Sequence, residues 1–377
     1  MDVQINSRQR TYGCIIVTCV VIGILGAYLL FGGERGDTGK DALLSKPPSN
    51  GRVKISEGKL LVDGEEFLIK GVAYSPTPIG IGYYNYDFYN YPEIYNRDFQ
   101  LLRAMNANTI KTYTKVTNKD FLDAAYNDGN DPIYVIMGFP VDATKIYDNE
   151  YRKNIIAEFK DYVGTFKDHP AVLMWMVGNE MNYWIHSDEL LKKWYTLLND
   201  LAIAAYEVEG DNYHPVVTSN CEIDDIGKPE LKSDDNSLSY LDAWGVTTYR
   251  DSLALLLSTY KTKTSKPIIF TELGCDAWNM IENREDEDTQ ASWAANLWND
   301  MVKSDIVLGG TFFEWTDEWY KAGLPAEHNL GGYELDTFPD KYMNEEWFGI
   351  MRVVDNGTGP DILEPRQIYY TLQEKWA

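Results

Sequence analysis

The sequence predicts an α/β protein of the (β/α)8 barrel class, and three features indicate it. Short apolar stretches alternate with longer amphipathic stretches, which is the order of elements expected for a parallel sheet. Eight apolar stretches can be counted, and most are continuous rather than alternating, as expected for strands buried on both faces. The chain has 377 residues, which is enough for one such barrel of about 250 residues with added segments.

Three segments precede the predicted barrel. Residues 1–12 form a polar tail that contains Arg8 and Arg10, and residues 13–32 carry no charge. About 20 apolar residues can cross a bilayer as a helix, and the basic residues lie on the N-terminal side of this stretch. We therefore expect a signal anchor at 13–32, a cytoplasmic tail at 1–12, and a single-pass type II membrane protein whose folded part is luminal or extracellular. Residues 33–52, rich in Gly, Ser, Asp and Pro, are predicted to be a flexible linker.

The remaining residues, 53–377, are predicted to form one domain. Asp63-Gly64 between two apolar runs predicts a β-hairpin, which we expect to close the bottom of the barrel and lead into the first strand. Asn118 is a candidate helix cap. The predicted barrel strands are 67–74, 109–114, 132–139, 171–178, 215–220, 243–249, 267–273 and 307–315, and the predicted helices are 95–105, 119–126, 149–166, 188–209, 252–260 and 289–303.

Two glutamates stand at the ends of predicted strands. Glu180 follows the apolar run that begins at Val172, and Glu272 lies near the end of the run that begins at Pro267. In a parallel barrel, groups at the C-terminal ends of the strands converge on one site. A single glutamate after a strand is more often a solvated loop residue or a capping partner. Two carboxylates delivered in this way are instead the equipment needed to cleave a glycosidic bond.

This arrangement resembles the retaining glycoside hydrolases built on a (β/α)8 barrel, in which an Asn-Glu pair ends strand four and a second Glu ends strand seven. Asn179-Glu180 and Glu272 fall on predicted strands four and seven. The nearest family suggested by the motifs is the fungal β-1,3-glucanosyltransferases, family 72. The similar segments are IKGVAY at 69–74, NTIKTY at 108–113 and FTELGC at 270–275.

The chain also departs from that family. Lys111 stands where the family usually carries Arg, and the several luminal disulfides of the family are absent, since the chain has only 4 Cys. The tail resembles bacterial β-glycosidase barrels instead. The segments that carry this second likeness are EWTDEW at 314–319 and EEWFG at 345–349.

The resemblance implies that Glu272 is the nucleophile and Glu180 the acid/base. These roles need different pKa values, and Trp175 and Trp184 are candidates for an apolar wall that keeps Glu180 protonated. Asn179 is expected to hydrogen-bond the 2-hydroxyl of the sugar, or else to be a structural turn amide.

Other residues at predicted strand ends are candidates for substrate binding. Tyr249 is expected either to donate its hydroxyl to Glu272 or to be a core residue. Trp315 is expected to stack on the sugar ring, or to belong to the core. Lys111, Tyr113 and Tyr74 are expected to reach the rim of the site. The aromatic loop 80–91 could be a stacking platform or a satellite core.

Charge and composition limit the partners. The net charge of −24 makes nucleic acid an unlikely partner and disfavours anionic polysaccharides. The 11 Trp and 27 Tyr exceed the needs of a core and favour a binding cleft for an oligo- or polysaccharide. No Cys/His group has zinc spacing and no Gly-rich phosphate loop is present, so we expect neither metal nor cofactor. The acidic run 282–288 is interpreted as a solvated loop rather than a calcium site.

Two further features leave alternatives open. Cys221 and Cys275 could be bridged or could be free thiols. Asn356-Gly357-Thr358 is a glycosylation sequon that is usable in a luminal or extracellular domain.

Two functions remain in competition. The first is a membrane-anchored retaining β-glycosidase or transglycosylase acting on a neutral β-glucan-type glycan. The alternative is a non-catalytic glycan-binding protein on a degenerate barrel, which would share the aromatic cleft but would not need both carboxylates.

Overall fold

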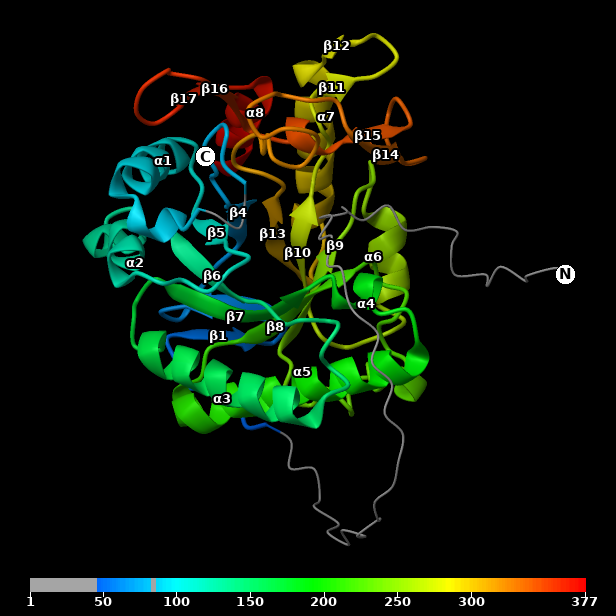
Figure 1. Ribbon diagram of the computed structural model, residues 1–377. Helices are drawn as coiled ribbons and strands as arrows, with labels where there is room; N and C mark the ends of the chain where they lie inside the picture. Colours follow the sequence, from blue (N-terminus) through cyan, green and yellow to red (C-terminus); the bar gives the residue numbers. More distant parts are fainter. Residues whose placement is uncertain (1–45, 83–85) are drawn as a thin grey trace, which may run out of the picture.

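A computed structural model describes residues 46–82 and 86–377. It contains a closed barrel of eight parallel strands in the order β10-β13-β4-β5-β6-β7-β8-β9 (Figure 1). The predicted barrel class is confirmed, and all eight predicted strands are present. The strands are β4 (Ile69–Ala73), β5 (Thr109–Lys111), β6 (Tyr134–Phe139), β7 (Val172–Asn179), β8 (Val216–Cys221), β9 (Ala243–Thr247), β10 (Ile268–Leu273) and β13 (Val307–Phe312).

Helices surround the barrel, and several begin at a residue whose side chain caps the first turn. Asn118, Asp148 and Ser187 each accept hydrogen bonds from backbone N–H groups of the helix that follows, as polar N-cap residues do. Between β8 and β9 the crossover contains the short 3-10 helix Pro229–Leu231 rather than an α-helix. The helices are α1 (Pro92–Ala104), α2 (Lys119–Tyr126), α3 (Asn149–Phe166), α4 (Met181–Trp184), α5 (Asp188–Glu209), α6 (Ala254–Tyr260), α7 (Glu287–Val302) and α8 (Gln367–Trp376).

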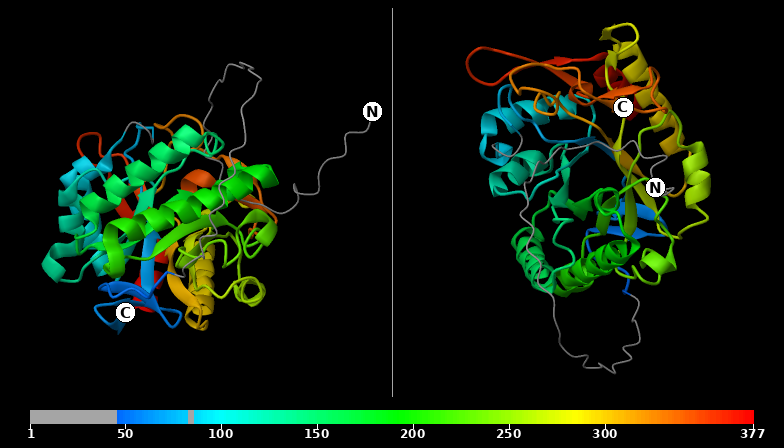
Figure 2. Two further views of the ribbon diagram at one scale, coloured as in Figure 1. Left: turned by 90° about the horizontal axis from the view of Figure 1, so that it is seen from below. Right: turned by 45° about the vertical axis from the view of Figure 1, so that its right-hand side comes forward.

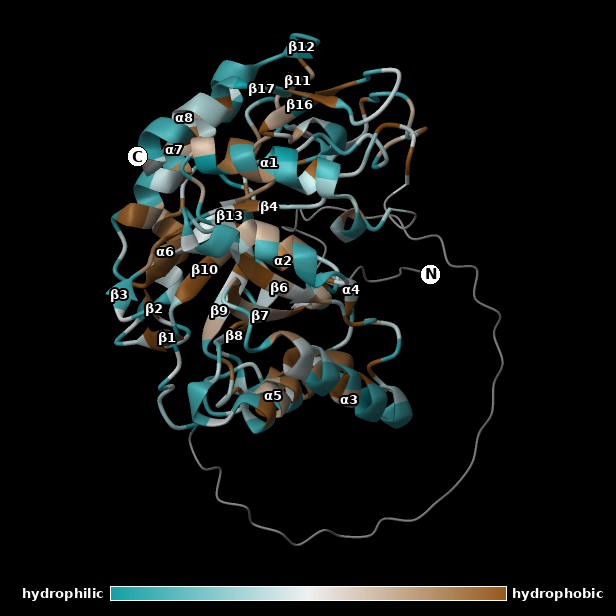
Figure 3. Cartoon of the chain, turned by 90° about the vertical axis from the view of Figure 1, so that its left-hand side faces the viewer, coloured by the Kyte–Doolittle hydropathy of each residue, from teal (hydrophilic) through white to brown (hydrophobic). Residues whose placement is uncertain are grey.

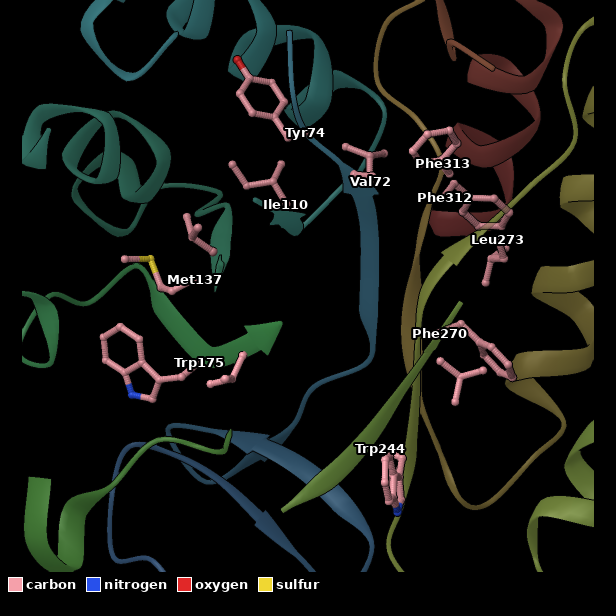
Figure 4. Close-up of a cluster of buried hydrophobic side chains, with 14 of the residues drawn as sticks. Val72, Tyr74, Ile110, Met137, Trp175, Trp244, Phe270, Leu273, Phe312 and Phe313 are labelled. Carbon is pink, nitrogen blue, oxygen red and sulfur yellow. The ribbon is translucent and has the colours of Figure 1, made fainter. Parts of the chain in front are cut away.

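The largest core lies between the strands and the helices. Side chains that point out of the barrel, such as Ile110, Trp244 and Phe270, are fully buried there (Figure 4). The paired helices α3 and α5 cover one side of the barrel (Figure 2). Hydropathy follows this layering, since the apolar segments are concentrated in the strands and in α5 (Figure 3).

A second core fills the lower end of the barrel and is covered by the predicted hairpin. Strands β1 (Val53–Ser56), β2 (Lys59–Val62) and β3 (Glu65–Glu66) form a small antiparallel sheet. Asp63 and Gly64 both have positive φ, as the turn predicted there requires. Apolar side chains of this hairpin pack with inward-facing side chains of the barrel strands. The members include Val53, Leu60, Val62, Ile69, Ile136, Met174, Met176, Val217, Ile269 and Leu308.

Three two-stranded sheets gather at the opposite end of the molecule, toward which the β10 arrow points in Figure 1. They come from the segments after β10 and β13, and the sequence did not predict them. The buried Arg366 donates to both oxygens of the buried Asp317, at 2.7 and 2.8 Å, and fixes this region to the chain that follows β13. The pairs are β11 (Trp278–Asn279) with β12 (Arg284–Glu285), β14 (Gly332–Glu334) with β15 (Tyr342–Asn344), and β16 (Met351–Val354) with β17 (Ile362–Pro365).

Several remaining expectations can be placed on the structure. The predicted membrane span at 13–32 lies outside the described residues, and among the residues that are described no helix is both long and apolar enough to cross a bilayer. Cys275 is a buried free thiol, so it forms no bridge with Cys221. Asn356 of the sequon is exposed.

The aromatic loop 80–91 is described except for residues 83–85. Phe88 and Tyr89 are buried and pack against Phe121. Tyr91 is 39% exposed and stacks on Tyr86 at 4.4 Å between ring centroids. The satellite-core reading therefore holds for Phe88 and Tyr89.

Candidate active site

A sharp turn at the end of β7 positions Glu180. Gly178 and Glu180 both have positive φ, +69° and +50°. A side chain at position 178 would come within 2.7 Å of Trp194, so glycine is needed there for both conformation and space. The Glu180 N–H donates to the Ser219 carbonyl at 2.7 Å, and its side chain is only 3% exposed. The turn thus moves the carboxyl group from the strand into the barrel end.

Glu272 lies in the last part of β10 and is 2% exposed. It pairs in register with Thr247 of β9, next to an irregularity in the ladder. Two groups hold its carboxylate. Lys111 Nζ donates to Oε1 at 2.8 Å, and the Tyr249 hydroxyl donates to Oε2 at 2.9 Å. The contact predicted for Tyr249 is therefore present.

Lys111 connects the two strands that carry the glutamates. It is fully buried, and its Nζ donates to Asn179 Oδ1 at 3.0 Å as well as to Glu272. Asn179 directly precedes Glu180, so one ammonium group joins the end of β7 to β10. The structure therefore brings Glu180 and Glu272 to the same end of the barrel interior, as the strand count predicted.

The two carboxyl groups differ in their preferred protonation states. Burial, followed by the negative charge of Glu272, raises the pKa of Glu180 well above its ordinary value. Burial acts in the same direction on Glu272, but Lys111 and the Tyr249 hydroxyl outweigh it and lower the pKa of Glu272. A carboxyl group whose pKa is raised, beside one whose pKa is lowered, is the combination that general-acid and nucleophile roles require.

Glu180 also retains unused hydrogen-bonding capacity. Its Oε1 is buried and has no hydrogen-bond partner among the described residues. Buried polar atoms without partners are rare in folded proteins, and those that occur often mark functional sites. A substrate oxygen placed there would supply the missing partner.

Partly exposed aromatic side chains surround this centre. The Tyr113 ring lies 4.0 Å from Lys111 Nζ, and its buried hydroxyl has no hydrogen-bond partner within the described chain. Trp184, on α4 just after Glu180, is 40% exposed and meets Tyr183 edge to face. Both residues are predicted to bind substrate, and the structure places them at the same end of the barrel as Glu180 and Glu272.

Two predicted substrate residues lie within the core instead. Tyr74 is fully buried against Phe88, Phe99 and Phe121, and its hydroxyl donates to the buried Asp98 at 3.0 Å. Trp315 is also fully buried, and its main chain pairs with Ala73 and Met351. Sugar binding by these two residues stays a prediction. Their described contacts do not include Glu180 or Glu272.

The prediction that Trp175 forms a wall beside Glu180 is wrong. Trp175 lies on the outer side of β7 (Figure 4), where it packs edge to face on Phe159 and Tyr162 of α3 and donates its indole N–H to Glu209. The wrong prediction has a physical cause: β7 is apolar on both faces, so its sequence does not show which residues point inward.

Sequence reasoning missed a cluster of charged side chains after β13. Lys321 Nζ lies 2.8 Å from Glu318, 3.7 Å from Glu314 and 4.2 Å from the centre of the Phe313 ring. Burial and the charge of Glu318 raise the pKa of Glu314 well above its usual range. The segment 314–319 had been noted for its likeness to other barrels, but nothing in its pattern indicated an ion cluster.

No metal site can be built from the described residues, where no group of three or more His, Cys, Asp or Glu is arranged to hold an ion. The acidic run 282–288 is used structurally. Glu285 pairs with Arg352 and Arg366, and Asp286 caps α7.

The chain is similar in sequence to known carbohydrate-active enzymes. A protein-family model described as "Glucanosyltransferase" matches residues 48–193, the part of the chain that contains Lys111, Asn179 and Glu180. The resemblance to glucanosyltransferases is thus confirmed for this part. The 1,3-beta-glucanosyltransferase gel2 of Aspergillus fumigatus is 25% identical over 304 residues, which are 74% of this chain and 60% of that relative. The chain therefore spans less than two thirds of the length of this curated relative.

Other proteins that match this chain are glycosidases, and the match covers only part of each. The beta-glucuronidase of Mus musculus is 28% identical over 130 residues, which are 34% of this chain and 19% of that protein. A GH2 beta-galacturonidase from Eisenbergiella tayi, solved with galacturonate, superposes with a TM-score of 0.61 at 15% identity, over 86% of this chain and 53% of that one. A beta-D-glucuronidase from Dictyoglomus thermophilum gives 0.60 at 17% identity, over the same shares of the two chains. At these identities the structural likeness shows a shared barrel fold.

Proposed function

We propose that this protein is a retaining β-glycosidase or transglycosylase that acts on a neutral β-glucan-type glycan. The observation that carries the proposal is a pair of buried glutamates at one end of the barrel, with Lys111 and Tyr249 bonded to Glu272, whose pKa values are shifted in opposite directions, that of Glu180 upward and that of Glu272 downward. The confirmed likeness to glucanosyltransferases supports the substrate class. The net charge of −24 favours a neutral rather than an anionic glycan.

The first half-reaction uses both groups at once. The Glu272 carboxylate attacks the anomeric carbon and forms a glycosyl-enzyme ester, while the bond from that carbon to the leaving oxygen breaks. Glu180 gives its proton to the leaving oxygen. Lys111 and Tyr249 keep Glu272 ionised and oriented before attack, and Asn179, held by Lys111, is available to the sugar ring.

The second half-reaction reverses the roles. Glu180, now a carboxylate, takes a proton from water or from a sugar hydroxyl, and that oxygen attacks the anomeric carbon and releases Glu272. Water gives hydrolysis and a sugar gives transfer. The stereochemistry at the anomeric carbon is retained after two displacements.

Substitution of each glutamate tests the proposal. Glu272→Ala and Glu180→Ala should each lower kcat by at least about a hundredfold on β-glucan oligosaccharides. On an aryl glycoside, whose leaving group departs without a proton from Glu180, added azide should then restore turnover with opposite anomeric products, an α-glycosyl azide from Glu272→Ala and a β-glycosyl azide from Glu180→Ala. The exposed Glu66→Ala is the matched control and should behave like wild type.

Product analysis in the same assay separates the competing functions. Shorter chains alone indicate hydrolysis, and longer chains in addition indicate transfer. Binding of oligosaccharides without any new product from the wild-type protein would overturn the catalytic proposal and favour the glycan-binding alternative.

We also propose that residues 13–32 anchor the protein, with the domain on the luminal or extracellular side. The support is the uncharged stretch with basic residues before it. Extraction at alkaline pH should leave the full chain in the membrane fraction, and protease added to sealed vesicles should spare the domain. Release of the intact chain by alkaline buffer would contradict the anchor.

A further inference from the structure

The β14–β15 hairpin is fixed to both strands that hold the nucleophile. The Asn344 N–H donates to Asp276, four residues beyond Glu272, at 3.1 Å. The Thr337 hydroxyl donates to the Tyr249 carbonyl at 2.7 Å, and Tyr249 in turn bonds Glu272. The hairpin therefore sits over the ends of β9 and β10 as a fixed part of the active-site end.

Tyr333 is the residue of β14 that faces inward. Its neighbours Gly332 and Glu334 are exposed, whereas Tyr333 packs against the main core. It lies opposite Met343, which is fully buried. Its hydroxyl is buried and has no hydrogen-bond partner among the residues that the structure describes. A buried hydroxyl without a partner costs free energy, so a ligand group that bonds it would be favoured.

The negative charges of the active site act on Tyr333. Burial raises its pKa, and the negative charges of Glu345, Glu180 and Glu272 raise it further, with Tyr183 also contributing. Tyr183 in turn has its pKa raised by burial and then by Glu180 and Glu345. The two tyrosines thus lie within electrostatic reach of the same two glutamates, from different elements.

Two further aromatic residues, Tyr183 and Trp184, lie on the short helix α4 that follows the turn carrying Glu180. They lie three and four residues after Glu180, and the Tyr183 N–H donates to the Glu180 carbonyl at 2.9 Å. Trp184 is 40% exposed. Large aromatic faces bind the apolar faces of sugar rings, and hydroxyl groups bond their edges.

We infer that Tyr333, together with Tyr183 and Trp184, binds the sugar on the acid/base side of the cleaved bond, the sugar that first leaves and then accepts. This inference rests on the proposed function, because the acid/base is the group that gives the proton to the leaving oxygen and takes it from the acceptor. The hairpin at 332–344 lies outside the region matched by the glucanosyltransferase model, 48–193. Tyr333 thus comes from a segment that this match does not include, whereas Tyr183 and Trp184 lie inside the matched region.

Tyr333→Phe tests the inference because it removes only the unpartnered hydroxyl. The substrates are a β-glucan oligosaccharide, whose leaving group is a sugar, and the corresponding aryl glycoside, whose leaving group is not. Loss of one neutral hydrogen bond should lower kcat/KM for the oligosaccharide about three- to tenfold, while the aryl glycoside changes less than twofold. Where sugar is transferred, the ratio of transfer to hydrolysis should fall by a similar factor.

Two further variants control the test. Trp184→Ala, at an exposed position, should lower the same oligosaccharide-to-aryl ratio, and Tyr370→Phe, an exposed tyrosine far along the chain, should leave it unchanged. Equal effects of Tyr333→Phe on both substrates, or no effect on either, overturn the inference while wild-type turnover upholds the proposed function. A wild-type protein that turns over neither substrate overturns both.

Discussion

Two lysine–glutamate pairs with the same separation lie at opposite ends of the barrel. Lys111 and Glu272 are 2.8 Å apart with side chains 0% and 3% exposed. Lys59 and Glu66, on the hairpin that closes the bottom, are also 2.8 Å apart but 40% and 62% exposed. Distance alone would assign the pairs equal weight. Their surroundings differ: the Lys111–Glu272 pair is buried in the candidate active site, and the Lys59–Glu66 pair is exposed to solvent.

The contrast extends to the side chains around each pair. At the lower end the interior is apolar and the hairpin seals it. At the upper end, buried polar atoms lack hydrogen-bond partners within the described chain, and both charges of the ion pair have been removed from water. Such an arrangement is costly without a ligand, and the combination of a fully buried ion pair with unpartnered carboxyl and hydroxyl oxygens marks the active-site end. The atoms are Glu180 Oε1, Glu314 Oε1 and the hydroxyl oxygens of Tyr113 and Tyr333.

Lys111→Met should cause the largest losses of stability and of activity. Removal of one partner from a buried pair typically costs about 3–5 kcal/mol, because the other charge remains buried. We expect a loss of unfolding free energy of this size at pH 7 and a fall in kcat/KM of about a hundredfold or more. Urea unfolding and steady-state kinetics measure the two quantities. Lys321→Met, which removes a buried lysine that does not bond Glu272, should leave kcat/KM higher than Lys111→Met does.

The same variant makes a prediction about pH. In the wild type, folding lowers the pKa of Glu272. The ionised Glu272 therefore stabilises the fold at pH values above its pKa in the unfolded chain, and this stabilisation is lost as the pH falls through its pKa in the folded protein. Without Lys111, burial raises the pKa of Glu272, and the destabilisation then grows as pH rises above the unfolded value. The stability difference between variant and wild type should therefore shrink as pH is lowered. A difference that is constant with pH would show that Lys111 does not act through Glu272.

Leu60→Ala should affect stability almost as much, with no effect on chemistry. Leu60 is 1% exposed and packs in the lower core. Large-to-small substitutions of this kind cost about 2–5 kcal/mol. The pH profile and kcat, measured well below the midpoint of thermal unfolding, should match wild type. A changed pH profile would mean that the base of the barrel supports the site and that the two ends are not independent.

Tyr249→Phe should have a smaller effect confined to the upper end. It removes the 2.9 Å hydrogen bond to Glu272 while leaving a ring to pack against Phe313 and Phe348. A hydrogen bond to a charged group contributes about 1.5–3 kcal/mol. The pKa of Glu272 should rise, so the acid limb of the pH–activity profile should move to higher pH.

Tyr74→Phe is the matched control, since it removes a buried tyrosine hydroxyl that bonds Asp98 instead. It should lower stability and leave the acid limb in place. A shifted limb in this variant would mean that the limb is not specific to the hydrogen bond between Tyr249 and Glu272.

Much of this architecture could be predicted from the sequence, because long strands and helices have recognisable patterns of apolar and polar residues. The continuous apolar runs predicted all eight barrel strands, and α2, α3 and α5 begin and end where the pattern placed them. The convergence of Glu180 and Glu272 followed from strand order, and the contact of Tyr249 with Glu272 is one of the two alternatives that the sequence left open for that residue. These predictions required only that strand ends converge, which the barrel class guarantees.

The parts that could not be predicted depend on tertiary contacts. Strands β14 and β15 have three residues each, too short for a periodic pattern, and their position depends on bonds to Asp276 and Tyr249. Trp175 was assigned to the wrong face because an all-apolar strand hides its orientation. The Lys321 cluster was missed because charged side chains are usually solvated, and only the fold shows that these are buried.

Lys59→Ala should change stability least, and it tests the exposed pair at the hairpin end of the barrel. Exposed ion pairs contribute about 0.2–1 kcal/mol, so we expect an urea midpoint close to that of wild type. A double-mutant cycle with Glu66→Ala isolates the interaction, because it subtracts whatever each side chain contributes alone. The coupling should be below about 0.5 kcal/mol and should vanish at high salt. A coupling as large as the one obtained from the same cycle on Lys111 and Glu272 would mean that contact distance, rather than removal from water, sets the strength of both pairs. The contrast between the two ends of the barrel would then be lost.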